Sequence, residues 1–314
     1  MIRAEGPITV ERYMTLCNEH YYTTRDPLGA AGDFTTAPEI SQMFGELVGA
    51  ALADCWLRAG APADAVYVEL GPGRGTLAAD ALRVMAKSGL RPPVHFVETS
   101  PVLRRAQAER VPDTQWHGAI EDLPEAPILL VANEFIDALP VRQWAGDKER
   151  RVAIDNDALV FTLNGAIRED SPVRETAATA IASHLSKHGG VALIIDYGHA
   201  RSGSGDTLQA VRGHAFADVL ANPGEQDLTA HVDFEALAKA AESAAVTTAV
   251  ALGEWLERLG IGARAQALTA AHPDREDQIA AERQRLCAPA EMGELFKVMA
   301  FHSRAWPQHA GFAK

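Results

Sequence analysis

Short apolar runs alternate with helical patterns along most of the chain. The runs that predict strands cover residues 66–69, 94–98, 114–117, 128–132, 191–198 and 297–302. Helical patterns lie between or after these runs, for example at 77–85, 176–188 and 234–244. Because strands that alternate with helices favour parallel pairing, this order predicts an α/β fold with a doubly wound, mostly parallel sheet.

Three regions depart from this alternation. Near the N-terminus, Thr36 to Glu39 predicts a capping box that starts a helix with apolar residues from Ile40 to Cys55. Short β-like runs joined by turn signals predict an antiparallel insertion near 141–175, and a helical insertion is predicted near 254–290. We therefore expect an N-terminal helical lid region at 1–60 and a main domain at 61–314.

The most informative local pattern lies between the first predicted strand and the helix after it. The strand ends in Glu69 and is followed by Gly71, Gly73 and Gly75. Glycines permit positive φ and let a ligand approach the backbone, and the N–H groups at the helix start favour a polar or anionic ligand group. This turn predicts a site for a nucleoside-type cofactor. A turn with only a packing role is the alternative.

The spacing of these glycines distinguishes two classes of cofactor. The dinucleotide fingerprint GxGxxG, counted from Gly71, requires a glycine where this chain has Thr76. The pattern is instead ExGxGxG, which resembles the first motif of methyltransferases that use S-adenosylmethionine (SAM). In those enzymes the acid faces the methionine part of SAM. A carboxylate would repel a pyrophosphate, but not the ammonium and sulfonium groups of SAM.

Polar residues follow two other predicted strands. Glu98 ends the second strand, where an acid can accept hydrogen bonds from both ribose hydroxyls, and Asn133 follows the fourth. NAD proteins use the same kind of ribose acid, so Glu98 indicates a ribose rather than SAM in particular. Ligands bind at the carboxyl ends of strands in open α/β sheets. The predicted cofactor site comprises Glu69, Gly71, Gly73, Gly75, Glu98 and Asn133.

Composition narrows the class of protein further. The formal net charge of −13 argues against broad nucleic-acid binding, and it would suit a basic protein substrate. The three cysteines form no CxxC pair, so neither a disulfide framework nor a metal site is expected. No apolar stretch is long enough to span a bilayer, and residues 1–10 lack a signal-peptide core or an arginine-rich leader. We expect a bacterial cytoplasmic protein, with a processed chain of the mitochondrial matrix as the alternative.

Motifs from nearly the whole chain together resemble one known family. They include GDFTTAPEISQ at 32–42, ELGPGRGTL at 69–77, NEFIDALPV at 133–141, DYGH at 196–199 and DLTAHVDF at 227–234. In these segments the sequence is similar to the MidA-like family, which includes the mitochondrial methyltransferase that assists assembly of respiratory complex I. The resemblance implies a Rossmann-like class I methyltransferase fold with extra helical parts and SAM as cofactor. It also implies arginine methylation of a protein, with a complex I subunit as a candidate substrate.

Transfer of a methyl group to arginine needs carboxylates that orient the guanidinium and localise its charge, because the high pKa of arginine makes a simple general base insufficient. Glu134, directly after the fourth strand, is the best candidate. Asp137 is a second candidate, with a helix-start charge as the alternative. Asp33 and Phe34 could fold over the cofactor as part of a lid, or Asp33 could bond its own backbone in a turn.

The sequence therefore leaves three candidate functions. The first is a SAM-dependent methyltransferase that acts on a protein arginine. The second is a nucleotide-dependent oxidoreductase, against which Thr76 counts. The third is a non-catalytic assembly factor that keeps the fold, against which the intact glycines, Glu69 and Glu98 count.

Overall fold

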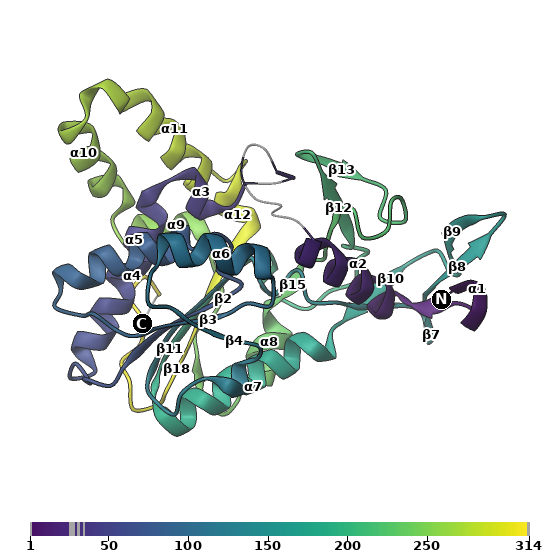
Figure 1. Cartoon of the computed structure of the whole chain (residues 1–314), viewed down its shortest axis with the longest axis horizontal. Helices are drawn as coiled ribbons and strands as arrows, with labels where there is room; N and C mark the ends of the chain where they lie inside the picture. The colour runs from purple at the N-terminus through teal and green to yellow at the C-terminus, as the bar shows by residue number, and fades with distance from the viewer. Residues whose placement is uncertain (1, 25–28, 30–31, 34, 313–314) are drawn as a thin grey trace.

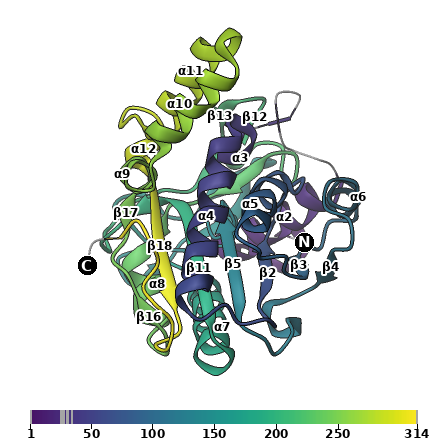
Figure 2. The ribbon, with the colours of Figure 1, turned by 90° about the vertical axis from the view of Figure 1, so that its left-hand side faces the viewer.

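The computed structural model describes residues 2–24, 29, 32–33 and 35–312. Its centre is a nine-stranded sheet (Figure 1), whose main strands follow the order β16-β18-β11-β5-β2-β3-β4, as labelled in Figure 2. These strands are β2 (Val66–Leu70), β3 (Val94–Val97), β4 (Gln115–His117), β5 (Ile128–Asn133), β11 (Gly190–His199), β16 (Ala245–Val246) and β18 (Phe296–His302). The strands from β4 to β11 pair in parallel, and β18 runs antiparallel to β11. The predicted doubly wound, mostly parallel sheet is confirmed.

Helices cover both faces of this sheet. One face packs against α4 (Gln42–Arg58) and α5 (Thr76–Lys87), and the other packs against α7 (Pro172–His188) and α8 (Phe234–Ala240). Successive side chains of a strand point to opposite faces, so Tyr67 joins the first core and Val68 the second. This is why β2, β5 and most of β11 read as continuous apolar runs.

The N-terminal part differs from the prediction in two details. After α1 (Ile2–Glu5), α2 (Val10–Thr24) and α3 (Ala37–Ile40), the chain enters α4. The predicted capping box is wrong, because the Thr36 side chain makes no capping bond and Glu39 instead accepts a hydrogen bond from Thr76 Oγ1 (2.5 Å). The helix expected to run on from Thr36 is also interrupted at Ser41, whose Oγ accepts from Met43 N (3.3 Å) and starts α4. The domain boundary expected near residue 60 falls between α4 and β2, and it stays a prediction.

The predicted antiparallel insertion is present, but it forms parts of two sheets. One contains β10 (Ile167–Asp170), β6 (Arg142–Ala145) and β7 (Lys148–Glu149), and the other contains β1 (Ile8–Thr9), β8 (Arg151–Asp155) and β9 (Ala158–Phe161). The pairing of β1 with β8 joins the chain start to this insertion (Figure 1). A further sheet, β13 (Ala215–Ala217), β12 (Gln209–Arg212) and β14 (Asp227–Thr229), had no apolar run to predict it.

The predicted helical insertion is confirmed and is divided into shorter helices. It comprises α9 (Leu252–Arg258), α10 (Ile261–Ala271), the 3-10 turn η2 (Pro273–Arg275), α11 (Glu276–Cys287) and α12 (Met292–Leu295). Gly260, with φ of 90°, separates α9 from α10. The pair α10 and α11 projects away from the sheet (Figure 2).

The remaining elements are short. They are α6 (Pro101–Arg110), the 3-10 turn η1 (Ile120–Asp122), β15 (Val232–Asp233), which pairs with β11, and β17 (Val250–Ala251), which pairs with β18. The helix predicted at 234–244 ends earlier, at Ala240, and the short strands β16 and β17 follow it. Among the described helices, none is both long and apolar enough to cross a membrane.

Candidate active site

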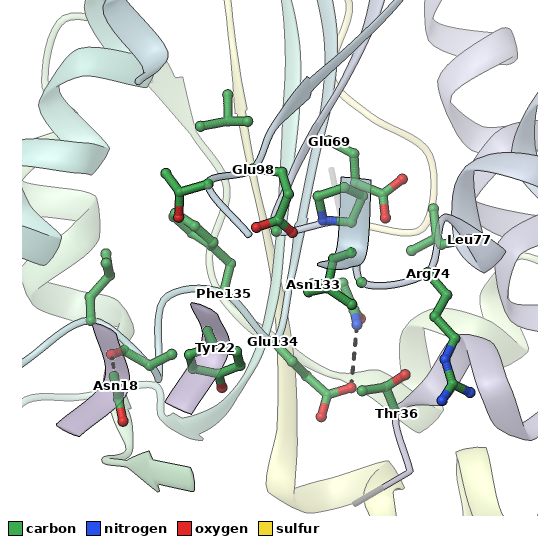
Figure 3. A pocket seen from close by; sticks show the side chains of 18 of the residues that line it. Asn18, Tyr22, Thr36, Glu69, Arg74, Leu77, Glu98, Asn133, Glu134 and Phe135 are labelled. Carbon is green, nitrogen blue, oxygen red and sulfur yellow. Dashed lines mark hydrogen bonds between the residues drawn. The ribbon is translucent and has the colours of Figure 1, made fainter. Parts of the chain in front are cut away.

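A cavity of about 400 Å³ opens where β2, β3 and β5 end (Figure 3). The carboxyl ends of parallel strands are where open α/β sheets bind ligands. The polar side chains that line this cavity include five glutamates, namely Glu19, Glu39, Glu69, Glu98 and Glu134, together with Asn18, Tyr22, Arg74 and Asn133. The cavity therefore unites all the predicted strand-end residues with residues of α2.

Gly71 and Gly73 of the glycine turn line the cavity, whereas the predicted Gly75 does not and instead caps α5. Gly71, Gly73 and Gly75 have φ of 58°, 54° and 77°, in the left-handed region that favours glycine. A Cβ at Gly71 would lie 2.9 Å from Phe135 Cδ2, so the backbone must pass this ring without a side chain. Gly75 also starts α5 and thereby leaves the helix N-terminus open toward the turn.

Glu69 brings a buried carboxyl group to the end of β2. It is 3% exposed, and its Oε2 accepts a hydrogen bond from the Tyr67 hydroxyl (2.7 Å). Burial raises the pKa of Glu69 to about 8, and the Tyr67 bond offsets only part of this rise. A ligand that brings positive charge to this side chain would stabilise the ionised form. The environment of Glu69 therefore fits the cationic methionine end of SAM.

Glu98 is held by hydrogen bonds at the end of β3. Its Oε1 accepts from Ser100 N (2.7 Å) and its Oε2 accepts from Gln107 Nε2 (3.3 Å). Burial raises the pKa of this carboxyl, and the bond from Ser100 N opposes the rise. The side chain is fixed and faces the cavity, so it is placed to accept hydrogen bonds from ribose hydroxyls.

Gln107 supports the site through hydrogen bonds, and it was not among the residues predicted from the sequence. Its side chain is fully buried, and its Nε2 also donates to Gly73 O (2.7 Å). The Gln107 Oε1 accepts from Trp116 Nε1 (2.8 Å). This one amide thus links the glycine turn, Glu98 and β4. The sequence contained no signal for this role.

Asn133 and Glu134 stand together at the end of β5. Glu134 has φ of 50°, a conformation that costs a non-glycine residue about 1–3 kcal/mol and that clusters at functional sites. Its Oε1 accepts from Ala37 N and from Asn133 Nδ2, both at 3.3 Å. Burial raises the pKa of Glu134 to about 8, and the nearby Asp137 carboxylate adds to the rise. Among the described residues, the buried Asn133 Oδ1 has no hydrogen-bond partner, which fits a ligand N–H group.

Asp137 lies behind the cavity and does not line it. It is 4% exposed, and burial raises the pKa of its carboxyl group while a bond from Tyr197 opposes the rise. Its backbone carbonyl accepts a hydrogen bond from Arg174 Nη2 (2.7 Å), and its backbone N–H donates to Asp196 Oδ2 (3.1 Å). The structure therefore brings Asp137 close to Glu134 but places it within a buried network, and its catalytic role stays a prediction.

Asp33 is likewise placed away from the cavity lining. Its Oδ2 accepts from the Tyr21 hydroxyl (2.7 Å), and its Oδ1 accepts from Gly213 N (2.8 Å) in the turn between β12 and β13. These bonds tie the segment before α3 to α2 and to that hairpin. Phe34, named with Asp33 as part of a lid, lies outside the described residues. The lid role also stays a prediction.

No group of histidine, cysteine or acidic residues within the described ranges could hold a metal ion. The donors that the structure brings together are instead suited to an organic cation with a ribose. Glu69 and Asn133 would hold the charged end of this ligand, and Glu98 would hold its ribose. The glycine turn would let the ligand approach the protein backbone closely.

Comparisons with known proteins agree with this geometry. A family model described as "Putative S-adenosyl-L-methionine-dependent methyltransferase" matches residues 47–171 and 154–252. "Protein arginine methyltransferase NDUFAF7 homolog, mitochondrial" of Drosophila melanogaster is 37% identical, covering 95% of this chain and 82% of that protein. "Protein arginine methyltransferase NDUFAF7, mitochondrial" of Homo sapiens is 33% identical, covering 95% of this chain and 81% of that protein.

A solved structure extends the likeness to three dimensions. A protein from Burkholderia thailandensis, crystallised with S-adenosyl-homocysteine, superposes with a TM-score of 0.87 at 28% identity, over 99% of this chain and 91% of that chain. A native crystal form from the same organism gives a TM-score of 0.84 at the same identity, over 100% of this chain and 92% of that chain.

Proposed function

Because this chain belongs to a family of S-adenosyl-L-methionine-dependent methyltransferases, we propose that its methyl acceptor is an arginine side chain of a protein. The single observation that carries the proposal is Glu134. This carboxylate lies in the same cavity as the cofactor residues, on a strained backbone that holds it there. The relatives named as protein arginine methyltransferases support the choice of arginine.

The cofactor and the acceptor would use different residues of the cavity. Glu69, Glu98, Asn133 and the glycine turn would hold SAM. When bound, SAM supplies a methyl group on a positively charged sulfur, open to attack along the line of the carbon–sulfur bond. The buried walls exclude water and restrict how the acceptor can approach, which is the main contribution that a methyltransferase must make.

Glu134 would orient the guanidinium and draw its positive charge toward the nitrogens that do not react. This leaves a lone pair on the attacking nitrogen, from which the new nitrogen–carbon bond forms. The electrons of the carbon–sulfur bond leave with sulfur, giving S-adenosylhomocysteine, and one proton leaves the nitrogen for solvent. The methylated guanidinium keeps its single positive charge, so the Glu134 carboxylate would stabilise both the acceptor and the product.

We also infer a place for this activity in the cell. The resemblance to the MidA-like family supports a subunit of respiratory complex I as the acceptor protein, in the bacterial cytoplasm or the mitochondrial matrix. The relatives at 33–37% identity carry mitochondrial names.

The proposal is tested with the charge of Glu134. Purified wild-type protein, Glu134→Gln and the exposed control Glu109→Gln are incubated with methyl-labelled SAM and a lysate that lacks the native protein. SAM binding is measured on the same samples by calorimetry. We expect a labelled protein band with the wild type and the control, and about 10²–10⁴-fold slower labelling with Glu134→Gln at nearly unchanged SAM affinity.

Two results would count against it. Equal losses of SAM binding and labelling in Glu134→Gln would make Glu134 a cofactor residue. Tight SAM binding by the wild type with no labelled band in any lysate fraction would favour the non-catalytic assembly factor instead.

A further inference from the structure

The cavity is larger than the set of residues assigned to the cofactor. Its other wall comes from α2, through Thr15, Asn18, Glu19, Tyr22 and Thr23. Figure 3 shows Asn18 and Tyr22 on the opposite side of Glu134 from Arg74 and Leu77. The predicted cofactor residues include none from α2, so this wall is available to the second substrate.

Hydrogen bonds hold α2 in a defined position at this wall. Asn18 Nδ2 donates to Ala138 O (2.9 Å), in the segment just after Glu134, and to Leu228 O (2.8 Å) in β14. Leu228 N donates back to Asn18 Oδ1 (3.3 Å). These hydrogen bonds connect the α2 wall to the segment that carries Glu134. The distance between α2 and Glu134 is therefore set by the fold.

The Tyr22 hydroxyl is prepared to accept hydrogen bonds. It donates its only proton to Asp227 Oδ1 (2.7 Å), which leaves the lone pairs of its oxygen for another donor. Asp227 is 5% exposed and sits behind Tyr22, outside the cavity lining. Burial raises the pKa of Asp227 to about 7, so its carboxylate is ionised above that pH and then accepts the Tyr22 proton. Burial together with this negative charge raises the pKa of Tyr22, so the phenol stays neutral.

Glu19 adds a free negative charge to the same wall. It is exposed, and within the described part of the chain its carboxylate makes no hydrogen bond or ion pair. Among the described residues that line the cavity, Arg74 is the only lysine or arginine, and it lies on the opposite side from α2 in Figure 3. The α2 wall thus presents acceptors and negative charge to whatever enters.

We propose that α2 forms the acceptor subsite, in which the Tyr22 hydroxyl, held by Asp227, accepts a guanidinium N–H while Glu19 attracts the charge at the entrance. Glu134 and Tyr22 then hold the guanidinium from two elements, and Asn18 fixes the gap between them. This inference rests on the proposed arginine acceptor. It names the residues that would distinguish a charged guanidinium from a neutral side chain. Tyr22 and Glu19 are positioning and specificity residues here.

The test measures binding without methyl transfer. Protein saturated with S-adenosylhomocysteine is titrated with N-acetyl-arginine amide and, separately, with N-acetyl-citrulline amide, by ligand-observed NMR. Citrulline has nearly the same shape but no charge, so the ratio of the two affinities isolates recognition of the guanidinium. A purely structural role of Tyr22 would shift both affinities together and leave the ratio unchanged.

We expect the wild type to prefer the arginine amide. Tyr22→Phe should lower the preference about 10- to 100-fold, the range for a lost hydrogen bond to a charged group. Glu19→Gln should lower it about two- to fivefold, and high salt should remove the difference between Glu19→Gln and wild type.

Matched controls lie on the same helix. Tyr13→Phe removes a hydroxyl that donates to Val219 O (2.9 Å), and Glu11→Gln removes an acid that does not line the cavity. Both controls should keep the wild-type preference. No preference in the wild type, or an unchanged preference in Tyr22→Phe and Glu19→Gln, would overturn this inference. If label still reached arginine in the lysate experiment, the proposed function would stand without it.

Discussion

Binding of SAM should depend on pH through one residue, Glu69. In the folded protein, burial raises the pKa of this carboxyl group to about 8, so it is mostly protonated at pH 7 when no cation is near. The positive charge of SAM favours the ionised form. Binding therefore releases a proton, and affinity rises with pH throughout the range below 8.

The size of the effect follows from the populations. With a pKa of about 8, roughly 1% of Glu69 is ionised at pH 6 and about 9% at pH 7. If only the ionised form binds SAM well, the dissociation constant should fall about ninefold between these pH values, close to 1.4 kcal/mol. Measurements stay at or below pH 7, because α-amino groups such as that of SAM themselves titrate near ~7.7–8.0.

Calorimetric titration at pH 6 and pH 7, in two buffers of different ionisation enthalpy, measures both quantities. We expect the ninefold change and release of about one proton per SAM at pH 7. Glu69→Gln should bind more weakly and lose both effects. Burial also raises the pKa of Glu134 to about 8, so Glu134→Gln is the matched control and should keep both. The same pH dependence in Glu69→Gln as in the wild type would refute the reasoning.

Three further predictions concern the cofactor site. Gly73→Val should abolish SAM binding in a protein that is still folded by circular dichroism. The control Gly89→Val places valine at another positive φ (82°) in open space, so it should lower only the stability. SAM binding by folded Gly73→Val would contradict this prediction. Gln107→Leu should lower the free energy of unfolding by about 1–3 kcal/mol and weaken SAM binding, because Gly73 O and Trp116 Nε1 lose their hydrogen-bond partner. Chemical denaturation measures the first effect and calorimetry the second. Unchanged values of both would argue against a supporting role of Gln107. S-adenosylhomocysteine at about 100 times its dissociation constant should stabilise the fold by roughly 2.7 kcal/mol in thermal unfolding, while NAD should not, and the reverse would exclude the assigned cofactor.

The sheet and the cofactor turn were predictable from sequence because their signals are local. The apolar runs of β2 and β5 are each a few consecutive residues, and the glycines at 71, 73 and 75 directly follow β2. Parallel strands then bring their carboxyl ends together, so Glu69, Glu98 and Glu134 could be assigned to one site without knowing any side-chain contact.

The supporting contacts were not predictable, because they join distant parts of the chain. Tyr22 and Asp227 are 205 positions apart, and only the fold shows that they share a hydrogen bond. Gln107 has the appearance of an ordinary helix residue until its three partners are seen. The positive φ of Glu134 is also invisible in sequence, since glutamate rarely adopts it. The missed capping arrangement has the same origin, because Glu39 pairs with Thr76 rather than with its own helix.

The chemical identity of the modified residue tests the central claim most directly. The protein labelled in the lysate experiment is hydrolysed in acid, and the labelled amino acid is identified by mass spectrometry. The account predicts methylated arginine with the wild-type enzyme and with Glu109→Gln, and a loss of about 10²–10⁴-fold with Glu134→Gln. Label recovered as methyllysine, or released as methanol by mild base before the acid hydrolysis, would contradict it.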